Sequence, residues 1–319
     1  MSANGVKVVL GGSMISDWSS EVKEEYVRII KENQLWDVDT SIIYPQSEAV
    51  LGKLQGTLPI RVHTKTPGFK KGLLKRDIIL KAARESQSNV PEIDLYFLQT
   101  PDPDTPMEEY VGAVADLHKE GIFKRFGLSN FSAEETQQVY DLCEKNGWIS
   151  PTVYSGQYSA IARISEEDLF PVLRKLNISF WVYWPLAAGF LAKPFESFNL
   201  PGSEGFGPGR FSQSNFFGGM FNSIFNKPKL LEGLKLWGEV AKDEGITPAE
   251  LAYRWLHYHS ILKEGDAVIV GSSRPEQLES TLSGIAKGPL KASSVNKIEE
   301  VWKIARDDAP DCKPQYLSF

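Results

Sequence analysis

The sequence predicts a single α/β domain over residues 1–319, folded as a closed (β/α)8 barrel, the TIM barrel. Short apolar runs alternate with longer amphipathic runs, and this alternation is typical of a parallel sheet with helical crossovers. Eight strand candidates are present, each followed by a helix, and eight such units suit a closed barrel. The Gly11-Gly12 pair lacks the spacing of a dinucleotide-binding fingerprint, which disfavours a doubly wound open sheet.

Each predicted strand is a short apolar run. In chain order the strands cover residues 6–10, 36–39, 60–65, 93–98, 124–128, 152–154, 178–183 and 267–270. The fourth run is the clearest buried strand.

The predicted helices are indicated by periodicity and by local start signals. Apolar residues recur at helical spacing between residues 22 and 30. Ser132, with Glu135 three residues later, forms a capping-box signature. Thr247 and Pro248 supply an N-cap and a proline at the first helical position. Further helices are predicted over residues 72–84, 106–119, 166–176 and 273–285, with a C-terminal helix over 294–305.

One long segment after the seventh strand interrupts this rhythm. Residues 189–226 show no clear period and are rich in Gly, Phe, Ser and Pro. Loops longer than about 15 residues are usually functional or disordered. The many phenylalanines favour a lid or a pocket wall.

Composition and charge exclude several classes of function. The net charge is −6 and no tract of Lys and Arg is present, which argues against nucleic acid as a main partner. Cys143 and Cys312 have no metal or redox spacing, so we expect reduced thiols, a cytoplasmic location and no bound metal. No signal peptide and no apolar run of about 20 residues is seen, so we expect no transmembrane helix. We expect a monomer or a homodimer.

Polar residues close the predicted strands. In a (β/α)8 barrel the active site lies at the carboxyl ends of the strands. The residues at these ends therefore converge on one rim; in chain order they are Asp39, Lys65, Gln99, Ser129, Asn130, Ser155, Gln157, Tyr183, Trp184, Gly271, Ser272 and Arg274.

Asp39, Tyr44 and Lys65 form a candidate catalytic group. A free tyrosine has a pKa near ~10, and a neighbouring ammonium lowers that pKa by stabilising the phenolate. Asp39 would orient Lys65, and Tyr44 would become a general acid suited to protonating a carbonyl oxygen. The alternative is that Asp39 is a turn or cap residue, Tyr44 a half-buried aromatic and Lys65 a solvated residue at a strand end. Spacing alone favours that alternative.

Several linked motifs change this balance. The run from Val38 to Tyr44 (VDTSIIY), followed by Ser47-Glu48 and Leu51-Gly52, resembles the signature of the aldo-keto reductase family, and Lys65 stands where that family has its catalytic lysine. Similarity continues, in order, over residues 94–109, 121–132, 147–163, 173–191, 251–260 and 265–281. The branch it most resembles is that of the aflatoxin-aldehyde (succinic semialdehyde) reductases.

The resemblance implies a (β/α)8 barrel that binds NADP(H) and a small-molecule carbonyl substrate. Asp39, Tyr44 and Lys65 become the catalytic trio. Ser129 and Asn130 would hydrogen-bond the nicotinamide carboxamide, and Tyr183 would stack on the nicotinamide ring.

The resemblance also implies a site for the adenosine end of the cofactor. The junction from Gly271 through Ser272 to Arg274 would meet the 2′-phosphate, because backbone N–H groups at a helix start suit a phosphate. Arg274 adds a charged fork that favours NADP over NAD. Gln277 lies one helical turn further on and would assist.

Four positions depart from the family pattern. Gln99 stands where the family usually has a fourth catalytic residue, a histidine. Ser155 replaces a glutamine at the nicotinamide amide, for which Gln157 would compensate. Thr281 replaces an asparagine near the adenine, and Trp184 replaces a small polar residue beside the diphosphate.

The favoured function is NADPH-dependent reduction of an aldehyde or ketone. The substrate pocket is expected to be walled by Met14, Trp18, Trp184, Phe211 and other aromatics between 206 and 225, with Arg210 either contacting an anionic group or anchoring the loop. Such a wall favours an apolar or aromatic carbonyl, such as a secondary-metabolite intermediate. Two alternatives remain: an NADP-binding regulatory module with vestigial turnover, and a non-redox isomerase or dehydratase that uses Tyr44.

Overall fold

The computed structural model describes residues 5–17, 19–198, 207 and 209–311. The described strands form a closed barrel in the order β1 to β8, and every neighbouring pair is parallel. The strands are β1 Lys7–Gly11, β2 Asp37–Asp39, β3 Arg61–Lys65, β4 Ile93–Leu98, β5 Phe123–Ser129, β6 Val153–Gln157, β7 Ser179–Tyr183 and β8 Ala267–Val270. The predicted barrel is confirmed.

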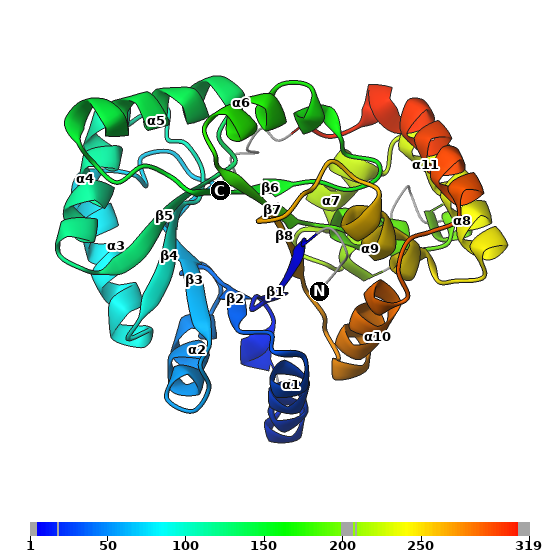
Figure 1. Cartoon of the computed structure of the whole chain (residues 1–319), viewed down its shortest axis with the longest axis horizontal. Coiled ribbons are helices and arrows are strands. Elements are labelled where there is room, and N and C mark those ends of the chain that lie inside the picture. The colour runs from blue at the N-terminus through cyan, green and yellow to red at the C-terminus, as the bar shows by residue number, and fades with distance from the viewer. Residues whose placement is uncertain (1–4, 18, 199–206, 208, 312–319) are drawn as a thin grey trace.

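Helices surround the strands on the outside of the barrel (Figure 1). Their bounds are α1 Ser20–Asn33, α2 Ser47–Gln55, α3 Arg76–Asn89, α4 Met107–Lys119, α5 Ala133–Asn146, α6 Leu169–Lys175, α7 Gly218–Phe225, α8 Pro228–Glu244, α9 Pro248–Tyr258, α10 Pro275–Ala286 and α11 Ala292–Ala305. No helix in the described part of the chain has the length and apolar character needed to cross a membrane.

The predicted helix starts at Ser132 and Thr247 are confirmed. The Ser132 hydroxyl accepts a hydrogen bond from the Glu135 amide at 3.1 Å, and the Glu135 carboxylate accepts one from the Ser132 amide at 2.7 Å. The Thr247 hydroxyl accepts from the Glu250 amide at 3.1 Å, ahead of Pro248. Each cap satisfies backbone donors that have no partner within the helix.

The third helix begins later than the sequence predicted. Residues 71–74 form a turn, Lys75 is the N-cap, and α3 starts at Arg76. The Asp102 carboxylate accepts hydrogen bonds from the amides of Gly72 and Leu74, each at 2.9 Å. Gly72 has a φ of +76°, in the left-handed region that glycine adopts readily. The Asp102 contacts therefore hold these amides outside the helix.

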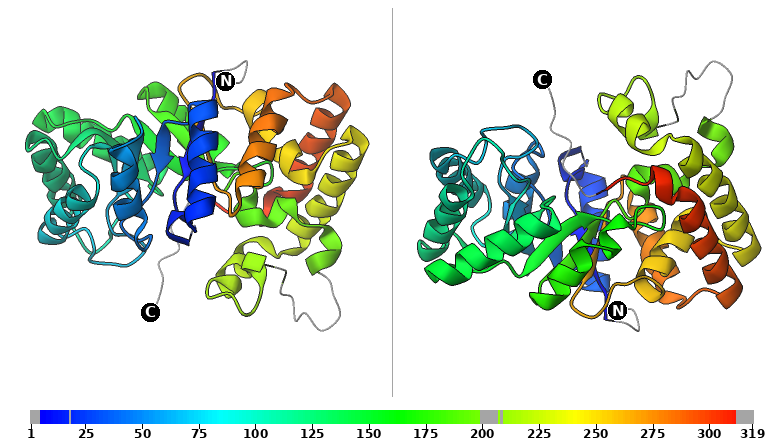
Figure 2. Two further views of the ribbon diagram at one scale, coloured as in Figure 1. Left: turned by 90° about the horizontal axis from the view of Figure 1, so that it is seen from below. Right: turned by 90° about the horizontal axis from the view of Figure 1, so that it is seen from above.

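The segment after β7 contains more structure than expected. Its described part forms short 3-10 turns at Ala187–Ala192, Phe195–Phe198 and Gly209–Phe211, and then α7. Five of its phenylalanines pack together with ring-centre distances of 4.9 to 6.3 Å: Phe190, Phe198, Phe211, Phe221 and Phe225. Figure 2 shows α7 projecting from one end of the barrel. These rings are continuous with the main hydrophobic core of the barrel.

Helix α8 was not assigned from the sequence. Its buried positions include Leu230, Leu234, Trp237 and Ala241, at helical spacing after Pro228 at the first turn. The signal was therefore present in the sequence. Helices α8 and α11 lie side by side on the outside of the barrel (Figure 1).

The inside of the barrel is filled by side chains. A compact apolar cluster takes residues from five strands: Val9, Leu95, Phe97, Val153, Trp181, Ala267 and Ile269. His63 is fully buried against Trp181, and its ring nitrogens lie 3.0 Å from Asp37 and 3.4 Å from Asp94. The interior is thus a packed core and not a pore.

Helix α2 approaches the end of α3 closely. A Cβ at Gly52 would lie 1.8 Å from the carbonyl oxygen of Asn89, well inside contact distance. Only glycine permits this spacing, and the spacing fixes α2, together with the loop that precedes it, against the outer wall.

Candidate active site

The predicted polar residues gather at one end of the barrel. Asp39, Lys65, Ser129 and Tyr183 are the last residues of β2, β3, β5 and β7, and Gln99 directly follows β4. Because all strands are parallel, these carboxyl ends meet on the same rim.

Lys65 and Asp39 form a buried ion pair. The Lys65 Nζ donates to Asp39 Oδ1 at 2.5 Å and to the Thr40 carbonyl oxygen at 2.7 Å. Their side chains are only 6% and 9% exposed. A buried charge is tolerated when it is paired and hydrogen-bonded, and both conditions hold here. The ammonium group is therefore held in one position.

Tyr44 lies in the loop after β2, in a turn closed by a hydrogen bond from its amide to the Ser41 carbonyl oxygen at 2.9 Å. Burial raises the pKa of Tyr44 above its ordinary value, the negative charge of Asp39 adds to this, and the positive charge of Arg210 opposes it. From the sequence, Lys65 was expected to lower this pKa. The structure gives the opposite direction, because burial disfavours the phenolate and the Lys65 ammonium is already paired with Asp39.

Gln99 is buried and anchored on several sides. Its Oε1 accepts a hydrogen bond from the Ser41 hydroxyl at 2.7 Å. Its backbone amide donates to the Thr66 hydroxyl at 3.1 Å, and its backbone carbonyl oxygen accepts from Asn130 Nδ2 at 2.8 Å. Gln99 as a whole is only 4% exposed, so protein groups set the orientation of its side-chain amide.

Asn130 joins the ends of three strands. Its Nδ2 donates to the Gln99 carbonyl oxygen and, at 3.0 Å, to the Ser129 hydroxyl. Its Oδ1 accepts from the Tyr183 hydroxyl at 2.6 Å. The backbone of Asn130 has a φ of +63°, a conformation that asparagine tolerates better than most residues. The residues expected at the nicotinamide thus form one connected group.

Ser155 and Gln157 lie in β6, beside this group. Ser155 pairs in register with Ser129 of β5 and with Trp181 of β7. Its side chain is 1% exposed, and within the described structure its hydroxyl has no hydrogen-bond partner. A buried polar atom without a partner is costly, so this hydroxyl suits a polar ligand group.

A cavity of about 600 Å³ lies between the segment after β7 and the start of α10. Its lining includes Gly271, Arg274 and Gln277, which the sequence assigned to the adenosine end of the cofactor, and also Arg210 and Lys193. Lys193 was not predicted; it lies inside the aperiodic segment, where the sequence pattern gives no register. Three cationic side chains therefore border one cavity.

Two other residues of this region have protein partners. The Ser272 hydroxyl and carbonyl oxygen are bound by the Tyr26 hydroxyl of α1, at 2.9 and 3.1 Å. The Gln277 Oε1 accepts hydrogen bonds from the amide and the hydroxyl of Ser273, both at 3.1 Å. Ser272 is not among the residues that line the cavity, and the contact recorded for it is with Tyr26 of α1.

The expected pocket wall is only partly assembled. Met14 is half-buried after β1, and Trp184 is half-buried edge-on to Phe221 at 5.5 Å. Phe211 has no exposed surface: it packs inside the aromatic cluster and borders the 600 Å³ cavity. Trp18 and Phe206 lie outside the described residues.

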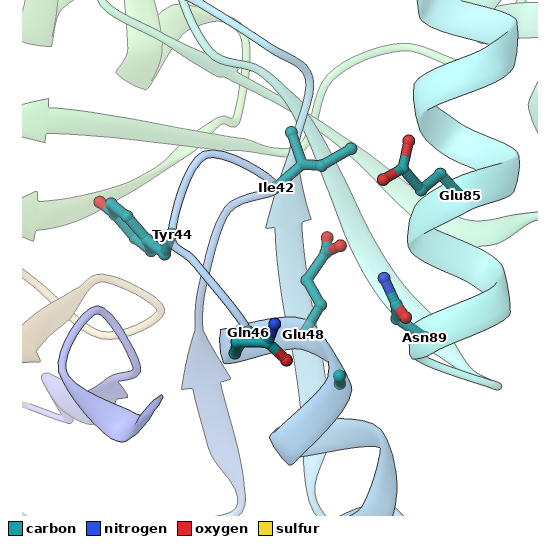
Figure 3. A pocket seen from close by; sticks show the side chains of 7 residues that line it. Ile42, Tyr44, Gln46, Glu48, Glu85 and Asn89 are labelled. Atoms are coloured by element: carbon teal, nitrogen blue, oxygen red, sulfur yellow. The ribbon is translucent and has the colours of Figure 1, made fainter. Parts of the chain in front are cut away.

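A second, smaller cavity of about 220 Å³ lies outside the barrel, beside α2 and α3. Figure 3 shows the Tyr44 ring turned away from Glu85 and Asn89, which lie across this cavity. The Glu48 carboxylate is buried and accepts a hydrogen bond from the Thr64 hydroxyl at 2.6 Å. No group of three His, Cys, Asp or Glu that could hold a metal ion is found among the described residues.

Comparison with known proteins identifies relatives over nearly the whole chain. The model of the Aldo/keto reductase family matches residues 7–303. The oxidoreductase sirO of Leptosphaeria maculans is 35% identical over 305 residues, which is 94% of this chain and 91% of that protein. An aldo-keto reductase of Pseudocercospora fijiensis is 41% identical over 216 residues, 67% of this chain and 72% of that protein.

Mammalian relatives agree with the fungal ones. Aflatoxin B1 aldehyde reductase member 2 of Rattus norvegicus is 34% identical over 300 residues, 89% of this chain and 81% of that protein. The family model, these relatives and the closed barrel with a lysine–aspartate pair at its rim all confirm the resemblance seen in the motifs. The chain belongs to the aldo/keto reductase family.

Proposed function

We propose that this protein uses NADPH to reduce an aldehyde or ketone, with Tyr44 as the proton donor. The family implies carbonyl reduction. The observation that carries the proposal is the buried Lys65–Asp39 pair at the rim where Tyr44 and Gln99 also lie. A fixed cation, a phenol and an amide at one strand-end rim are the groups that protonation of a carbonyl oxygen needs.

The residues present fit NADPH. The Ser155 hydroxyl, buried without a partner, suits the polar carboxamide of the nicotinamide. Tyr183 lies beside Ser129 and Asn130 and offers a ring face for stacking. Arg274, Arg210 and Lys193 around the 600 Å³ cavity supply positive charge for the cofactor phosphates. When bound, NADPH supplies the hydride.

The protein's own groups would carry the proton chemistry. A tyrosine whose pKa is raised above its ordinary value stays protonated through neutral pH, so Tyr44 is ready to donate in the direction of reduction. As the proton leaves, the Lys65 ammonium would stabilise the phenolate, and Asp39 would hold the ammonium in place. The Gln99 amide would orient the carbonyl, but it stays neutral and takes no part in a proton relay.

The substrate class is proposed from the surroundings of the site. The half-buried Trp184, which packs on Phe221 and Phe225, places aromatic surface near the rim. Such surface favours an apolar or aromatic carbonyl, including secondary-metabolite carbonyls. Cys143 is buried with a free thiol, which fits the reducing cytoplasm that we propose as the location.

The test mixes purified protein with NADPH and a broad panel of carbonyls, and follows cofactor oxidation and product mass. Turnover with a gain of two hydrogens supports the proposal. Tight NADPH binding without turnover would indicate a regulatory module. A product of unchanged mass, or one lighter by water, formed without NADPH consumption would indicate an isomerase or dehydratase.

The Tyr44→Phe variant tests the assignment of the acid. It keeps the ring but has no proton to donate, so reduction should fall by about 10²-fold or more while NADPH still binds. Because the pKa of Tyr44 is raised, wild-type reduction should show no loss from Tyr44 ionisation between neutral pH and about 10. Wild-type turnover by Tyr44→Phe would exclude Tyr44 as the acid.

A further inference from the structure

Ser41 is a buried residue of the loop after β2 that carries Tyr44. It has no exposed surface, and its hydroxyl donates to Gln99 Oε1 at 2.7 Å. The two residues are 58 positions apart in the chain and belong to the loops after β2 and β4. Their bond therefore connects the ends of two strands that are separated in the barrel by β3.

The rest of Gln99 is already fixed. Thr66 binds its backbone amide and Asn130 binds its carbonyl oxygen. A Cβ at Gly68 would lie 2.9 Å from both Cβ and Cγ of Gln99, so the Gly68 backbone packs directly on the start of the side chain. The main freedom left is rotation of the terminal amide, whose preferences are broad and roughly two-fold.

That rotation decides which chemistry Gln99 offers. One face of the amide is an acceptor and the other is a donor of two N–H groups. The Ser41 Oγ also lies 3.5 Å from the Ile43 amide, from which it accepts, so its own hydroxyl proton is available for Gln99 Oε1. With its oxygen bound to Ser41, the Gln99 amide directs its N–H groups away from Ser41.

Ser41 also connects Gln99 to Tyr44 and Lys65 through the backbone of its loop. The Ser41 carbonyl oxygen accepts the hydrogen bond from the Tyr44 amide at 2.9 Å that closes the turn carrying Tyr44. The residue before Ser41, Thr40, gives its carbonyl oxygen to Lys65 Nζ at 2.7 Å. One short stretch of backbone therefore links the amide, the phenol and the ammonium.

We propose that Ser41 is a positioning residue that locks the Gln99 amide with its N–H groups toward the carbonyl oxygen that Tyr44 protonates. This inference rests on the proposed carbonyl reduction. By binding Oε1, Ser41 holds an amide that could otherwise rotate as a fixed hydrogen-bond donor. A fixed donor stabilises developing negative charge without having to reorganise during the reaction.

A double-mutant cycle tests the proposal. Ser41→Ala should lower kcat roughly three- to tenfold, the range expected for one hydrogen bond, and leave the KM for NADPH unchanged. In a Gln99→Leu background the same substitution should cause no further loss, because Ser41 acts through Gln99. The control, Ser86→Ala, removes a buried hydroxyl of α3 that has no partner in the described structure, and should leave kcat unchanged.

A structural measurement keeps the proposal separate from the proposed function. In a crystal structure of Ser41→Ala that distinguishes amide oxygen from nitrogen, Gln99 should occupy more than one orientation. Equal losses of kcat in the two backgrounds, or a single unchanged Gln99 orientation in Ser41→Ala, would overturn the role of Ser41. If the wild type reduces no carbonyl, carbonyl reduction is excluded, and the crystal structure alone decides whether Ser41 orients Gln99.

Discussion

The Tyr183 hydroxyl donates a 2.6 Å hydrogen bond to Oδ1 of Asn130, across the rim from the end of β7 to the residue that follows β5. The Asn130 Nδ2 is bound to Gln99 and Ser129, so the Tyr183 bond completes the hydrogen bonding of this amide. Besides the stacking that we propose for its ring, Tyr183 therefore determines which way the Asn130 amide faces.

Tyr183→Phe separates these two roles, because it keeps the ring and removes the hydroxyl. We expect NADPH to bind roughly three- to tenfold more weakly, as befits the loss of one hydrogen bond. Titration of cofactor fluorescence measures this. Tyr183→Leu, which removes the ring as well, should weaken binding further. If Tyr183→Phe binds NADPH as the wild type does, the bond to Asn130 does not organise the site.

Arg274 should decide the choice between NADPH and NADH. It is an exposed residue at the N-cap of α10 and it borders the 600 Å³ cavity. Only NADPH carries the 2′-phosphate that the guanidinium can grip, so Arg274→Ala should weaken NADPH binding far more than NADH binding. Arg306→Ala is the matched control, since Arg306 pairs with Glu167 and does not line this cavity. Equal weakening of both cofactors in titrations would rule out the assignment.

Gln99→His should raise turnover on simple aldehydes. A histidine can hydrogen-bond the carbonyl oxygen and also change its protonation state, whereas the amide stays neutral at every working pH. The gain should carry a new pH dependence near the ordinary histidine pKa of ~6.5. The measurement is kcat/KM for both proteins on a small aromatic aldehyde across pH. A wild type that is already efficient, with no gain from histidine, would show that Gln99 does not limit the reaction.

The charged network around His63 should make the barrel sensitive to acid. Burial alone would raise the pKa of Asp94, but hydrogen bonds from His63 and Arg125 outweigh burial and lower it to about 2. An unfolded aspartate titrates near ~3.9. The stabilisation by ionised Asp94 is therefore fully present above pH ~4, and is lost as the pH falls toward about 2.

Asp94→Asn should remove that contribution. The variant should be less stable at pH 7, by about 2 kcal/mol, and should lose less stability than the wild type as the pH is lowered from ~5 toward 3. Urea unfolding at several pH values measures both effects. Glu92→Gln is the control, because Glu92 is largely exposed and its pair with Lys124 should contribute little. An unchanged pH dependence in Asp94→Asn would show that this network does not set the acid limit.

The barrel was predictable because its signals are local. Short apolar runs, helical spacing between them, and caps such as Ser132–Glu135 each lie within a few residues, and together they specify the alternation of strand and helix. The strand ends then place Asp39, Lys65 and Gln99 on one rim with no further information. Motif resemblance supplied the site residues that spacing alone did not distinguish from ordinary turn residues.

The remaining features depend on contacts between distant segments. The bond from Ser41 to Gln99 and the bond from Tyr26 to Ser272 join residues 58 and 246 positions apart, and nothing in either local sequence indicates them. The raised pKa of Tyr44 depends on burial and on Asp39, which the sequence argument underweighted against Lys65. Lys193 is similar: it borders the cavity only because of how the aperiodic segment folds back.

The close approach of Gly52 to Asn89 couples the position of helix α2, on the outside of the barrel, to the position of the loop that carries Tyr44. Helix α2 follows directly from the turn that carries Ser41 and Tyr44, and Ser47 at its start binds the Gly12 carbonyl oxygen at 2.8 Å. Any side chain at position 52 would meet the Asn89 carbonyl oxygen, and the helix and the turn would have to shift together. Helix α2 contributes none of the proposed catalytic groups, yet a substitution at Gly52 would therefore displace Ser41 and Tyr44 and lower the proposed activity.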